Sequence, residues 1–276
     1  MYRIVNKRVL SDGVAFMTVE APFVAARCEP GQFVMVSVDE DGERIPLTIQ
    51  DYDRKASTIN IVFQAVGYST KRLYELNEGD ILPVFLGPLG SPVHFHTDKP
   101  IKRVAAIGGG VGIAPLYPQT RSLKEAGATV DAILGGRSAE FVILREEFKA
   151  VSDEVFFVTN DGSLGKRGLV TDLLKERLDG GVTYDLAVAI GPLVMMKAVV
   201  DITKPLGIAT SVSLNPVMVD GTGMCGGCRV TVGGETKFVC VDGPDFDGLK
   251  VDFDEVMNRQ KFYKEEEAAF PLSHKR

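Results

Sequence analysis

The sequence has no uncharged apolar run long enough to cross a bilayer. No stretch of about 18 such residues occurs in its 276 positions, and its first residues, Met-Tyr-Arg-Ile-Val-Asn-Lys-Arg, do not resemble a signal peptide. We therefore expect no association with membranes. Basic residues are not in excess either: 31 Lys and Arg stand against 37 Asp and Glu, which gives a net charge of −6. A chain with this charge has no general affinity for nucleic acid.

Cysteine is scarce. The chain has four cysteines, and three of them lie between residues 225 and 240. So few cysteines, clustered in this way, do not form the framework of a disulfide-stabilised secreted protein. We therefore expect a reducing, cytoplasmic compartment. Cys28 stands alone between Arg27 and Glu29, and we interpret it as a structural residue.

The three clustered cysteines follow an aspartate in the pattern D-x4-C-x2-C-x11-C, which comprises Asp220, Cys225, Cys228 and Cys240. The spacing C-x4-C-x2-C is typical of 2Fe–2S sites, in which one loop wraps its ligands around a small inorganic core. The loop is rich in glycine, which lets backbone N–H groups approach such a core. The sequence therefore predicts a 2Fe–2S site held by these four residues.

A hairpin is expected to bring the last cysteine to this loop. Residues 229–232 and 235–240 have the pattern of two strands, and the Gly-Gly pair between them is a two-residue turn. In the register that this turn sets, Cys228 and Cys240 become neighbours. Loop and hairpin together can present four ligands to one place.

The motif has other interpretations. A single C-x2-C can be a redox dithiol, and three cysteines with one aspartate can bind zinc. A dithiol would leave Cys240 and the glycine-rich segment unexplained, and a structural zinc site usually has a second pair of ligands. Asp220 can also be an ordinary turn residue, in which case Asp242 or Asp245 would supply the fourth ligand.

Residues 1–97 contain short strand patterns rich in Val, Ile and Phe, separated by turn sequences such as Ser-Asp-Gly and Glu-Pro-Gly. This spacing predicts a small antiparallel β-barrel. One helix, at residues 70–76, interrupts it, with Ser69 as its N-cap. The predicted strands are residues 2–10, 14–21, 33–38, 44–50, 58–65 and 81–86.

Two segments of this barrel have the chemistry of a phosphate site. In Arg-Ile-Pro-Leu-Thr, Arg44 and Thr48 stand four apart on a strand, so their side chains point to the same face. In Val-Gly-Tyr-Ser-Thr, Gly67 precedes hydroxyl-bearing residues at a helix start, where free N–H groups favour a phosphate. Each segment alone is better explained as a strand or a capped helix. Together on a barrel they indicate a flavin nucleotide, with its pyrophosphate between them.

After Pro100 the pattern changes to buried strands that alternate with helices. An apolar run at residues 104–107 ends in Gly-Gly-Gly-Val-Gly-Ile-Ala-Pro and is followed by a helix at residues 116–126. This turn is not the G-x-G-x-x-G fingerprint, but it also lets a ligand phosphate contact the backbone at a helix start. Further strands are predicted at residues 130–134, 155–159, 186–190 and 209–214, and further helices at residues 139–150, 169–178 and 193–204.

This alternation predicts a doubly wound parallel sheet, whose ligands bind beyond the carboxyl ends of the strands. Glycine and polar residues lie at those ends, in Gly-Gly-Arg-Ser, Asn-Asp-Gly-Ser and Gly-Pro. One such segment can be a simple turn, but the series favours a nucleotide crevice. The candidate residues of this crevice are Gly108, Gly109, Gly110, Gly112, Ala114, Pro115, Arg137, Asp161, Gly162, Ser163, Gly191 and Pro192.

The sequence after Asp242 is acidic and unusually aromatic for a free tail, since it contains Phe246, Phe253, Phe262 and Phe270. A solvated helix of mixed charge is one interpretation. We expect instead that this tail docks on the protein itself or on a partner.

With these motifs in place, the chain resembles the ferredoxin–NADP reductase superfamily over its whole length. Arg-x-Pro-Leu-Thr is similar to the flavin motif of that superfamily, and Gly-Gly-Gly-x-Gly-x-Ala-Pro and Gly-Pro-x-x-Met-Met are similar to its pyridine-nucleotide motifs. The cluster loop narrows the resemblance to electron transfer subunits like that of dihydroorotate dehydrogenase. Those carry four cysteines, and here Asp220 replaces the first. With that aspartate, the chain looks most like small subunits of NADH-dependent reduced ferredoxin:NADP oxidoreductases, and sulfide dehydrogenase small subunits share the pattern.

The resemblance implies FAD, one 2Fe–2S cluster and NAD(H) as cofactors. It also implies a large iron–sulfur flavoprotein subunit as partner, which handles ferredoxin and NADP by electron bifurcation. Under this interpretation the segments are a FAD-binding barrel at residues 1–98, an NAD(P)-binding α/β domain at 99–215, a 2Fe–2S subdomain at 216–250 and a docking tail at 251–276. The implied flavin contacts are Arg44, Pro46, Leu47, Thr48, Val62, Phe63, Gly67, Ser69 and Thr70.

One departure from the superfamily matters for the chemistry. Many of its reductases have Cys-Gly-Pro where this chain has Ile190-Gly191-Pro192, so that position supplies no thiol near the nicotinamide. We assign no catalytic side-chain acid or base, and the flavin carries the chemistry. NADH is expected over NADPH, because Arg137 has no second basic residue beside it and Glu140 would repel a 2′-phosphate. Two alternative functions remain: a dihydroorotate dehydrogenase subunit, and a non-catalytic nucleotide-sensing module with structural zinc.

Overall fold

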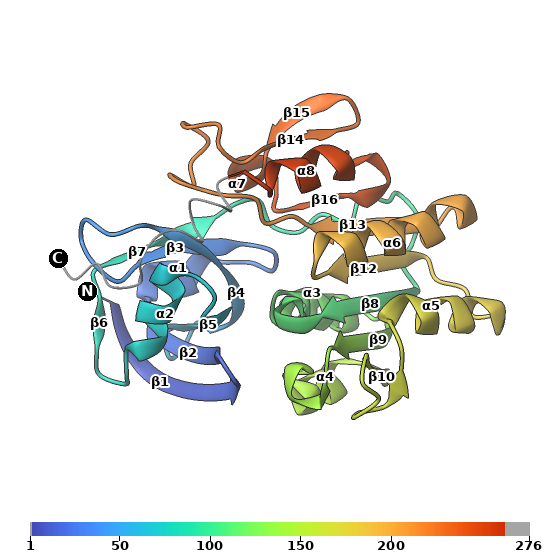
Figure 1. The fold of residues 1–276 in the computed structure, drawn as a ribbon, viewed down its shortest axis with the longest axis horizontal. Coiled ribbons are helices and arrows are strands. Elements are labelled where there is room, and N and C mark those ends of the chain that lie inside the picture. Colours follow the sequence, from blue (N-terminus) through green and yellow to red (C-terminus); the bar gives the residue numbers. More distant parts are fainter. Residues whose placement is uncertain (1, 263–276) are drawn as a thin grey trace.

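The computed structural model describes residues 2–262, which form two seven-stranded sheets and a two-stranded hairpin (Figure 1). The first sheet, on the left in Figure 1, has the order β6-β1-β2-β5-β4-β3-β7, and every neighbouring pair is antiparallel. It curves into a nearly closed barrel, as predicted. Its strands are β1 (Tyr2–Ser11), β2 (Val14–Glu20), β3 (Phe33–Ser37), β4 (Ile45–Asp53), β5 (Thr58–Gln64), β6 (Ile81–Leu82) and β7 (Val84–Leu89).

The barrel strands have two apolar faces where they meet the rest of the molecule. In β5, Ile59, Ile61 and Phe63 point into the barrel core, as the period of two along a strand requires. Val62 points the opposite way and belongs to the apolar core of the second sheet, as Ile113 does. The barrel wall at β2 and β5 therefore also forms the contact between the two sheets.

The helix of the flavin segment begins earlier than predicted. It is α2 (Tyr68–Glu75), with Gly67 at the N-cap, so the prediction of Ser69 as N-cap is wrong. The reason is that Thr70 reaches back: its Oγ1 accepts hydrogen bonds from the N–H groups of Gly67, at 2.9 Å, and Val66, at 3.1 Å. Ser69 instead donates its hydroxyl to the Glu43 carboxylate.

Two further features of the barrel differ from the prediction. The strand expected at residues 81–86 is interrupted at Pro83, which has no N–H to donate to a ladder. β6 therefore pairs with β1, and β7 crosses to pair with β3. A short helix not anticipated from the sequence, α1 (Pro22–Arg27), follows β2 and buries Val24 and Ala25.

The second sheet has the order β11-β10-β9-β8-β12-β13-β16. Its neighbours are parallel except for β16, which returns antiparallel to β13 at the edge. The predicted parallel sheet is confirmed, with this antiparallel edge as an addition. The strands are β8 (Arg103–Gly109), β9 (Thr129–Gly136), β10 (Glu154–Thr159), β11 (Lys166–Arg167), β12 (Leu186–Ile190), β13 (Ala209–Ser213) and β16 (Asp245–Asp247).

Both faces of this sheet are buried under helices. In β8, Val104 and Ala106 pack on the side of α3 and α4, whereas Ala105 and Ile107 pack on the side of α5 and α6. Such two-sided burial explains why its strands read as continuous apolar runs. In Figure 1, α3 lies between the sheet and the barrel. The helices are α3 (Ile113–Glu125), α4 (Arg145–Val151), α5 (Val170–Asp179) and α6 (Leu193–Thr203).

Two helix predictions in this region need correction. The helix expected at residues 139–150 is a 3-10 turn, Ala139–Phe141, followed by α4. The buried segment between them ends at Leu144, whose left-handed backbone (φ 54°) stops a continuous helix. Helix α3 starts at Ile113, three residues earlier than predicted, directly after a 3-10 turn at Gly110–Gly112, so Pro118 lies inside the helix.

The segment between β13 and β16 carries the clustered cysteines. It contains the hairpin of β14 (Arg229–Val232) and β15 (Glu235–Phe238), and then a one-turn helix, α7 (Val239–Asp242). The predicted second strand thus ends before Cys240, which lies in α7. Helix α8 (Phe253–Arg259) covers this region at the top of Figure 1.

The tail docks on the protein's own body as far as it is described. Phe246 and Phe253 are buried, while Phe262 is 61% exposed. Phe270 lies outside the described residues. Among residues 2–262, no helix is both long and apolar enough to span a membrane.

Candidate functional site

The hairpin places the last two cysteines side by side. Val232 pairs with Glu235 across the Gly-Gly turn, and the backbone N–H of Val239 donates to the carbonyl of Cys228 at 3.2 Å. The Sγ atoms of Cys228 and Cys240 are 3.2 Å apart, and both side chains are buried. The prediction that these two residues are neighbours is confirmed, although Cys240 comes from a helical turn.

The other two predicted ligands form a second, exposed pair. Cys225 Sγ lies 3.0 Å from Asp220 Oδ1. The second oxygen of Asp220 accepts hydrogen bonds from the Thr222 hydroxyl, at 2.8 Å, and from the N–H of Met224, at 2.9 Å. Asp220 therefore shapes the turn with one oxygen and faces Cys225 with the other.

The two alternative carboxylates are engaged elsewhere. Asp242 accepts a hydrogen bond from the backbone N–H of Phe238 at 2.6 Å. Asp245 is buried and accepts a hydrogen bond from Gln119 Nε2 on α3 at 2.9 Å. Among the described residues neither carboxylate is hydrogen-bonded to a cysteine, whereas Asp220 is, so the structure favours Asp220 as the fourth candidate ligand.

Two pairs of ligands suit a binuclear core better than a single ion. A 2Fe–2S cluster takes four protein ligands on two irons, whereas zinc requires four ligands around one point. In the described part of the chain, no three His, Cys, Asp or Glu side chains gather tightly enough to hold one metal ion. The N–H groups of Gly227 and Cys240 each lie 3.4 Å from a cysteine sulfur, as donors that can stabilise a charged core.

The loop's backbone requires glycine at two positions. Gly221 has φ +77°, and a Cβ there would lie 2.8 Å from Met35 Cγ on β3. Gly223 has φ +85°, and a Cβ there would lie 2.7 Å from a methyl group of Val241. Both values of φ are unfavourable for other residues. The loop can therefore pack tightly against β3 of the barrel and against α7 only with glycine at these positions.

The protonation of the candidate cluster ligands depends on their surroundings. Burial, with a contribution from the adjacent Cys228, raises the pKa of the Cys240 thiol to about 12. Hydrogen bonds from the Cys225 thiol and from Thr222 hold the pKa of Asp220 well below its usual range. Because metal ligation requires thiolates, iron must displace the protons of these thiols when the cluster forms.

The flavin segment begins just before β4. Arg44 is exposed and forms no ion pair with any described residue, so its guanidinium is available to a phosphate. Pro46, Leu47 and Thr48 lie on β4 and pair with Met35, Val34 and Phe33 of β3.

The other candidate flavin residues are less available. Thr70 holds the N-terminal turn of α2, and Ser69 is bound to Glu43. Phe63 is buried in the barrel core, so only its backbone can approach a ligand, while Val62 faces the second sheet. Arg44 is thus the candidate phosphate ligand that the structure leaves most free.

A cavity of about 590 Å³ opens at the carboxyl ends of the parallel strands, between the sheet and the barrel. Of the predicted crevice residues, Gly109, Gly110, Arg137 and Pro192 line it. Its volume falls in the range of small-molecule sites. The guanidinium of Arg137 lies over the Phe141 ring, with 3.7 Å between its Cζ and the ring centroid.

The remaining predicted crevice residues do not line this cavity. Gly112 allows close packing instead, because a Cβ there would lie 2.5 Å from the carbonyl oxygen of Ile190. Asp161 and Ser163 hold their own turn, through a hydrogen bond of 2.7 Å from the Ser163 hydroxyl. The other residues that the cavity does not include are Gly108, Ala114, Pro115, Gly162 and Gly191.

Sequence reasoning missed several cavity residues. Val14 and Gln64 come from the barrel, and no pattern in the sequence indicates that they face the second sheet. Leu169 and Val194 also line the cavity and are 55% and 67% exposed. Exposed apolar side chains at the starts of α5 and α6 could have been recognised only with the fold in hand.

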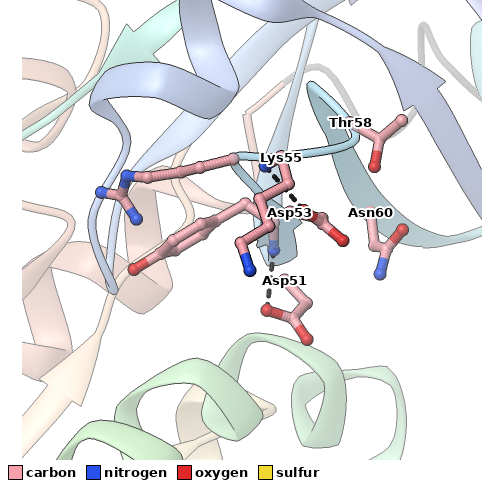
Figure 2. Close-up of a pocket in the computed structure, with 7 residues that line it drawn as sticks. Asp51, Asp53, Lys55, Thr58 and Asn60 are labelled. Atoms are coloured by element: carbon pink, nitrogen blue, oxygen red, sulfur yellow. Dashed lines mark hydrogen bonds between the residues drawn. The ribbon is translucent and has the colours of Figure 1, made fainter.

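A second cavity, of about 530 Å³, lies at the β4–β5 hairpin and contains none of the predicted residues (Figure 2). Its lining is polar and of mixed charge. It consists of Asp51, Tyr52, Asp53, Arg54, Lys55, Thr58 and Asn60.

Comparison with known proteins agrees with this geometry. The family described as the iron-sulfur cluster binding domain of dihydroorotate dehydrogenase B matches residues 215–252. A dihydroorotate dehydrogenase B (NAD(+)) electron transfer subunit homolog of Thermotoga maritima is 44% identical, over 96% of this chain and 92% of that protein. The chain belongs to the family of dihydroorotate dehydrogenase B electron transfer subunits. An uncharacterised protein of the adh 3′ region of Clostridium beijerinckii is 51% identical, over 99% of this chain and 94% of that protein.

Solved structures extend the comparison. That of an NADH-dependent reduced ferredoxin-NADP oxidoreductase is similar with a TM-score of 0.90 and 41% identity, over 97% of this chain and 95% of that chain. A cytochrome P450 reductase from Amycolatopsis, 22% identical with a TM-score of 0.61, shows the reductase fold alone. As a member of this family the chain is an oxidoreductase subunit, and the family and fold support the predicted FAD, 2Fe–2S cluster and NAD(H).

Proposed function

We propose that this subunit transfers electrons between NAD(H) and a larger iron–sulfur flavoprotein, through FAD and a 2Fe–2S cluster. The supporting observation is that the three candidate binding regions meet on the barrel. Gln64 of the barrel shares the dinucleotide cavity with Gly109. On the other side, the cluster loop packs its Gly221 against Met35, which pairs with Pro46 of the flavin segment. A flavin on that segment would lie between nucleotide and cluster.

The residues of this chain bind and orient the cofactors. Arg44 would hold the flavin pyrophosphate, with Thr48 on the same strand. Gly109 and Gly110 would let the dinucleotide approach the backbone before α3, where the helix N-terminus favours phosphate. Asp220, Cys225, Cys228 and Cys240 would ligate the cluster. When bound, FAD accepts a hydride from NADH and exchanges single electrons with the cluster.

The exposed side of the cluster loop is suited to a partner protein. Met224 is 88% exposed and Val219 62% exposed, close in sequence to the exposed Cys225. Val217 and Val241 add further exposed apolar surface, at 57% and 46%. Exposed apolar side chains grouped in this way are typical of protein contacts. We infer that the partner subunit covers this loop.

We propose that the complex is of the NADH-dependent reduced ferredoxin:NADP type, with ferredoxin and NADP handled by the partner. The similarity over nearly the whole of both chains to the oxidoreductase structure supports this choice. A dihydroorotate dehydrogenase partner is the second candidate, because the Thermotoga relative carries that name.

Co-expression with a catalytic subunit of each kind distinguishes the two. We expect a stable complex that reduces NADP with NADH and reduced ferredoxin together. A complex that instead reduces NAD with dihydroorotate would contradict the first choice and support the second.

The four predicted segments, with boundaries after residues 98, 215 and 250, are retained as a proposed functional division. One strand crosses that division: β16 lies within 216–250 but pairs with the nucleotide sheet. The cluster segment is therefore tied at both ends to the sheet that forms the dinucleotide cavity.

A further inference from the structure

Two ion pairs join the barrel strands to the second sheet and its helices within the described residues. The first links Arg121 of α3 to Asp51 of β4, with 2.5 Å between Nη1 and Oδ1. The second links Arg8 of β1 to Glu147 of α4, with 3.8 Å between the nearest atoms. The first pair is about a quarter exposed on each side, whereas the Arg8 side chain is half exposed. The Arg121–Asp51 pair is therefore the closer and better shielded of the two.

A β-bulge directs Asp51 toward α3. Ile49 pairs with Ile61, but Asp51 pairs with Asn60, so an extra residue, Gln50, is inserted on β4. Without the bulge, Asp51 would share the inward direction of Ile49. With it, Tyr52 packs on the barrel core and Asp51 points outward. Figure 2 shows Asp51 at the edge of the second cavity that faces a helix coloured green, the colour of α3 in Figure 1.

Both partners of this pair are held in place. Asp51 Oδ1 also accepts a hydrogen bond from the N–H of Tyr52 at 2.7 Å. The Arg121 guanidinium lies between two rings, 5.5 Å from the centroid of Tyr52 and 5.9 Å from that of Tyr117. A guanidinium fixed by rings and a carboxylate has a defined direction, which apolar contacts alone do not provide.

The pair lies at a distance from the nucleotide site but on the same rigid helix. Helix α3 starts at Ile113, just after the glycine turn that lines the dinucleotide cavity, and Ile113 belongs to the same apolar cluster as Val62 of the barrel. Arg121 is eight residues further along, or about 12 Å at 1.5 Å per residue. Apolar residues of β2 and β5 pack into the core of the second sheet near this end of the helix. The ion pair adds a directional polar contact further along α3, which opposes small rotations of the sheet against the barrel.

The helix itself is anchored to its own sheet. Gln119, which is buried, donates to Asp245 on β16 at 2.9 Å. A displacement at Arg121 would therefore move the nucleotide sheet relative to the barrel rather than bend α3 alone. Strand β4 carries Pro46, Leu47 and Thr48 of the flavin segment as well as Asp51.

We propose that the Arg121–Asp51 ion pair positions the nucleotide sheet against the barrel for hydride transfer between NADH and FAD. This inference rests on the proposed function. The pair contacts neither cofactor and acts through α3 and β4. Because hydride transfer demands close approach of the reacting atoms, a small rotation of the sheet against the barrel should slow the step, while dinucleotide affinity depends mainly on the cavity.

The test is anaerobic stopped-flow reduction of the holoprotein's flavin by NADH. Asp51→Asn and Arg121→Met should each lower the limiting rate about tenfold or more, with the Kd for NADH within about twofold of wild type. The double variant should be no slower than the slower single variant, because both remove one interaction. Arg121→Lys should retain part of the rate. Glu147→Gln, which removes the more exposed ion pair, is the matched control and should behave as wild type.

Several outcomes would overturn the proposal. Wild-type limiting rates in both single variants, additive losses in the double variant, or an equal loss in Glu147→Gln would show that this pair has no special role. Loss of FAD or iron in proportion to the loss of rate would show a structural role instead. A wild-type protein whose flavin NADH does not reduce would overturn the proposed function together with this inference, whereas the other outcomes leave the proposed function intact.

Discussion

At the scale of single residues, Asp220 has the most specific role. A carboxylate is a harder ligand than a thiolate, so an iron held partly by oxygen should differ in potential from one held by sulfur alone. We expect Asp220→Cys to keep the cluster and shift its midpoint potential, because the spacing already matches the four-cysteine pattern. Asp220→Ala should lose or destabilise the cluster. Iron content, EPR and a redox titration measure these effects.

The control is Thr222→Val, which removes the hydroxyl bonded to Asp220 Oδ2 and leaves all four candidate ligands in place. It should retain the cluster. If both Asp220 variants kept an intact cluster with unchanged EPR spectrum and potential, Asp220 would only shape the turn.

Arg44 is the second residue with a distinct prediction. Its guanidinium is exposed and without an ion-pair partner among the described residues. Arg44→Ala should remove a charge-assisted phosphate contact worth about 1.5–3 kcal/mol and yield protein depleted of FAD. Flavin content and the FAD dissociation constant measure this. Full occupancy with an unchanged constant would mean that Arg44 is a surface residue with no part in flavin binding.

At the scale of elements, strand β16 carries a buried acidic residue, Asp245. Burial raises the pKa of Asp245 to about 7, partly offset by the hydrogen bond from Gln119. Between about pH 4 and 7 the unfolded chain releases this proton while the folded protein keeps it. The stability contributed at this position therefore falls as pH rises through that range and stays low above pH 7.

Asp245→Asn should remove this dependence and retain an acceptor for Gln119. We expect the free energy of unfolding of the variant to exceed that of wild type by up to a few kcal/mol at pH 8.5, and by less at pH 6. Calorimetric unfolding measures this difference. Asp153→Asn is the contrasting control, since Lys124 lowers the pKa of Asp153 and its loss should destabilise equally at both pH values. An equal gain at pH 6 and 8.5 for Asp245→Asn would contradict this account.

The turn after β9 determines nucleotide preference in this account. Arg137 stacks on Phe141, and Glu140 accepts a hydrogen bond from Ser138 at 3.3 Å. With one arginine and a nearby carboxylate, this turn should favour NADH over NADPH. Glu140→Gln should lower the ratio of kcat/KM for NADH to kcat/KM for NADPH. Steady-state kcat/KM with both nucleotides measures it. A tenfold preference for NADPH, equivalent to about 1.4 kcal/mol, would contradict the prediction.

Elements differ in how far the sequence could predict them. The β14–β15 register followed from a two-residue glycine turn, whose geometry leaves little choice. In contrast, Cys240 was predicted in a strand because its helical turn is too short to show a period. Gly67, not Ser69, is the N-cap of α2, and Thr70 reaches back to its N–H group, since hydroxyl residues in succession do not reveal which one reaches back. The bulge at Gln50 has no signal in the sequence.

At the scale of the whole molecule, the two kinds of sheet could be predicted because their hydrophobic periods differ. Their mutual contact could not. Gln64 and Val14 line the dinucleotide cavity, and Met35 touches the cluster loop, only because the barrel and the sheet pack in one particular way. That packing depends on residues far apart in sequence that share one apolar core, such as Val62 and Ile113. A candidate site between the barrel and the second sheet can therefore be predicted only in part from the sequence.

The central claim is that one subunit carries electrons from NADH through a flavin to an iron–sulfur cluster. The most direct measurement is anaerobic titration of the purified holoprotein with NADH, followed by visible absorption and low-temperature EPR. The account predicts flavin and iron–sulfur absorption before addition, bleaching of the flavin by NADH, and the EPR signal of a reduced 2Fe–2S centre. A colourless protein that contains zinc, or a flavin and cluster that NADH leaves oxidised, would contradict it.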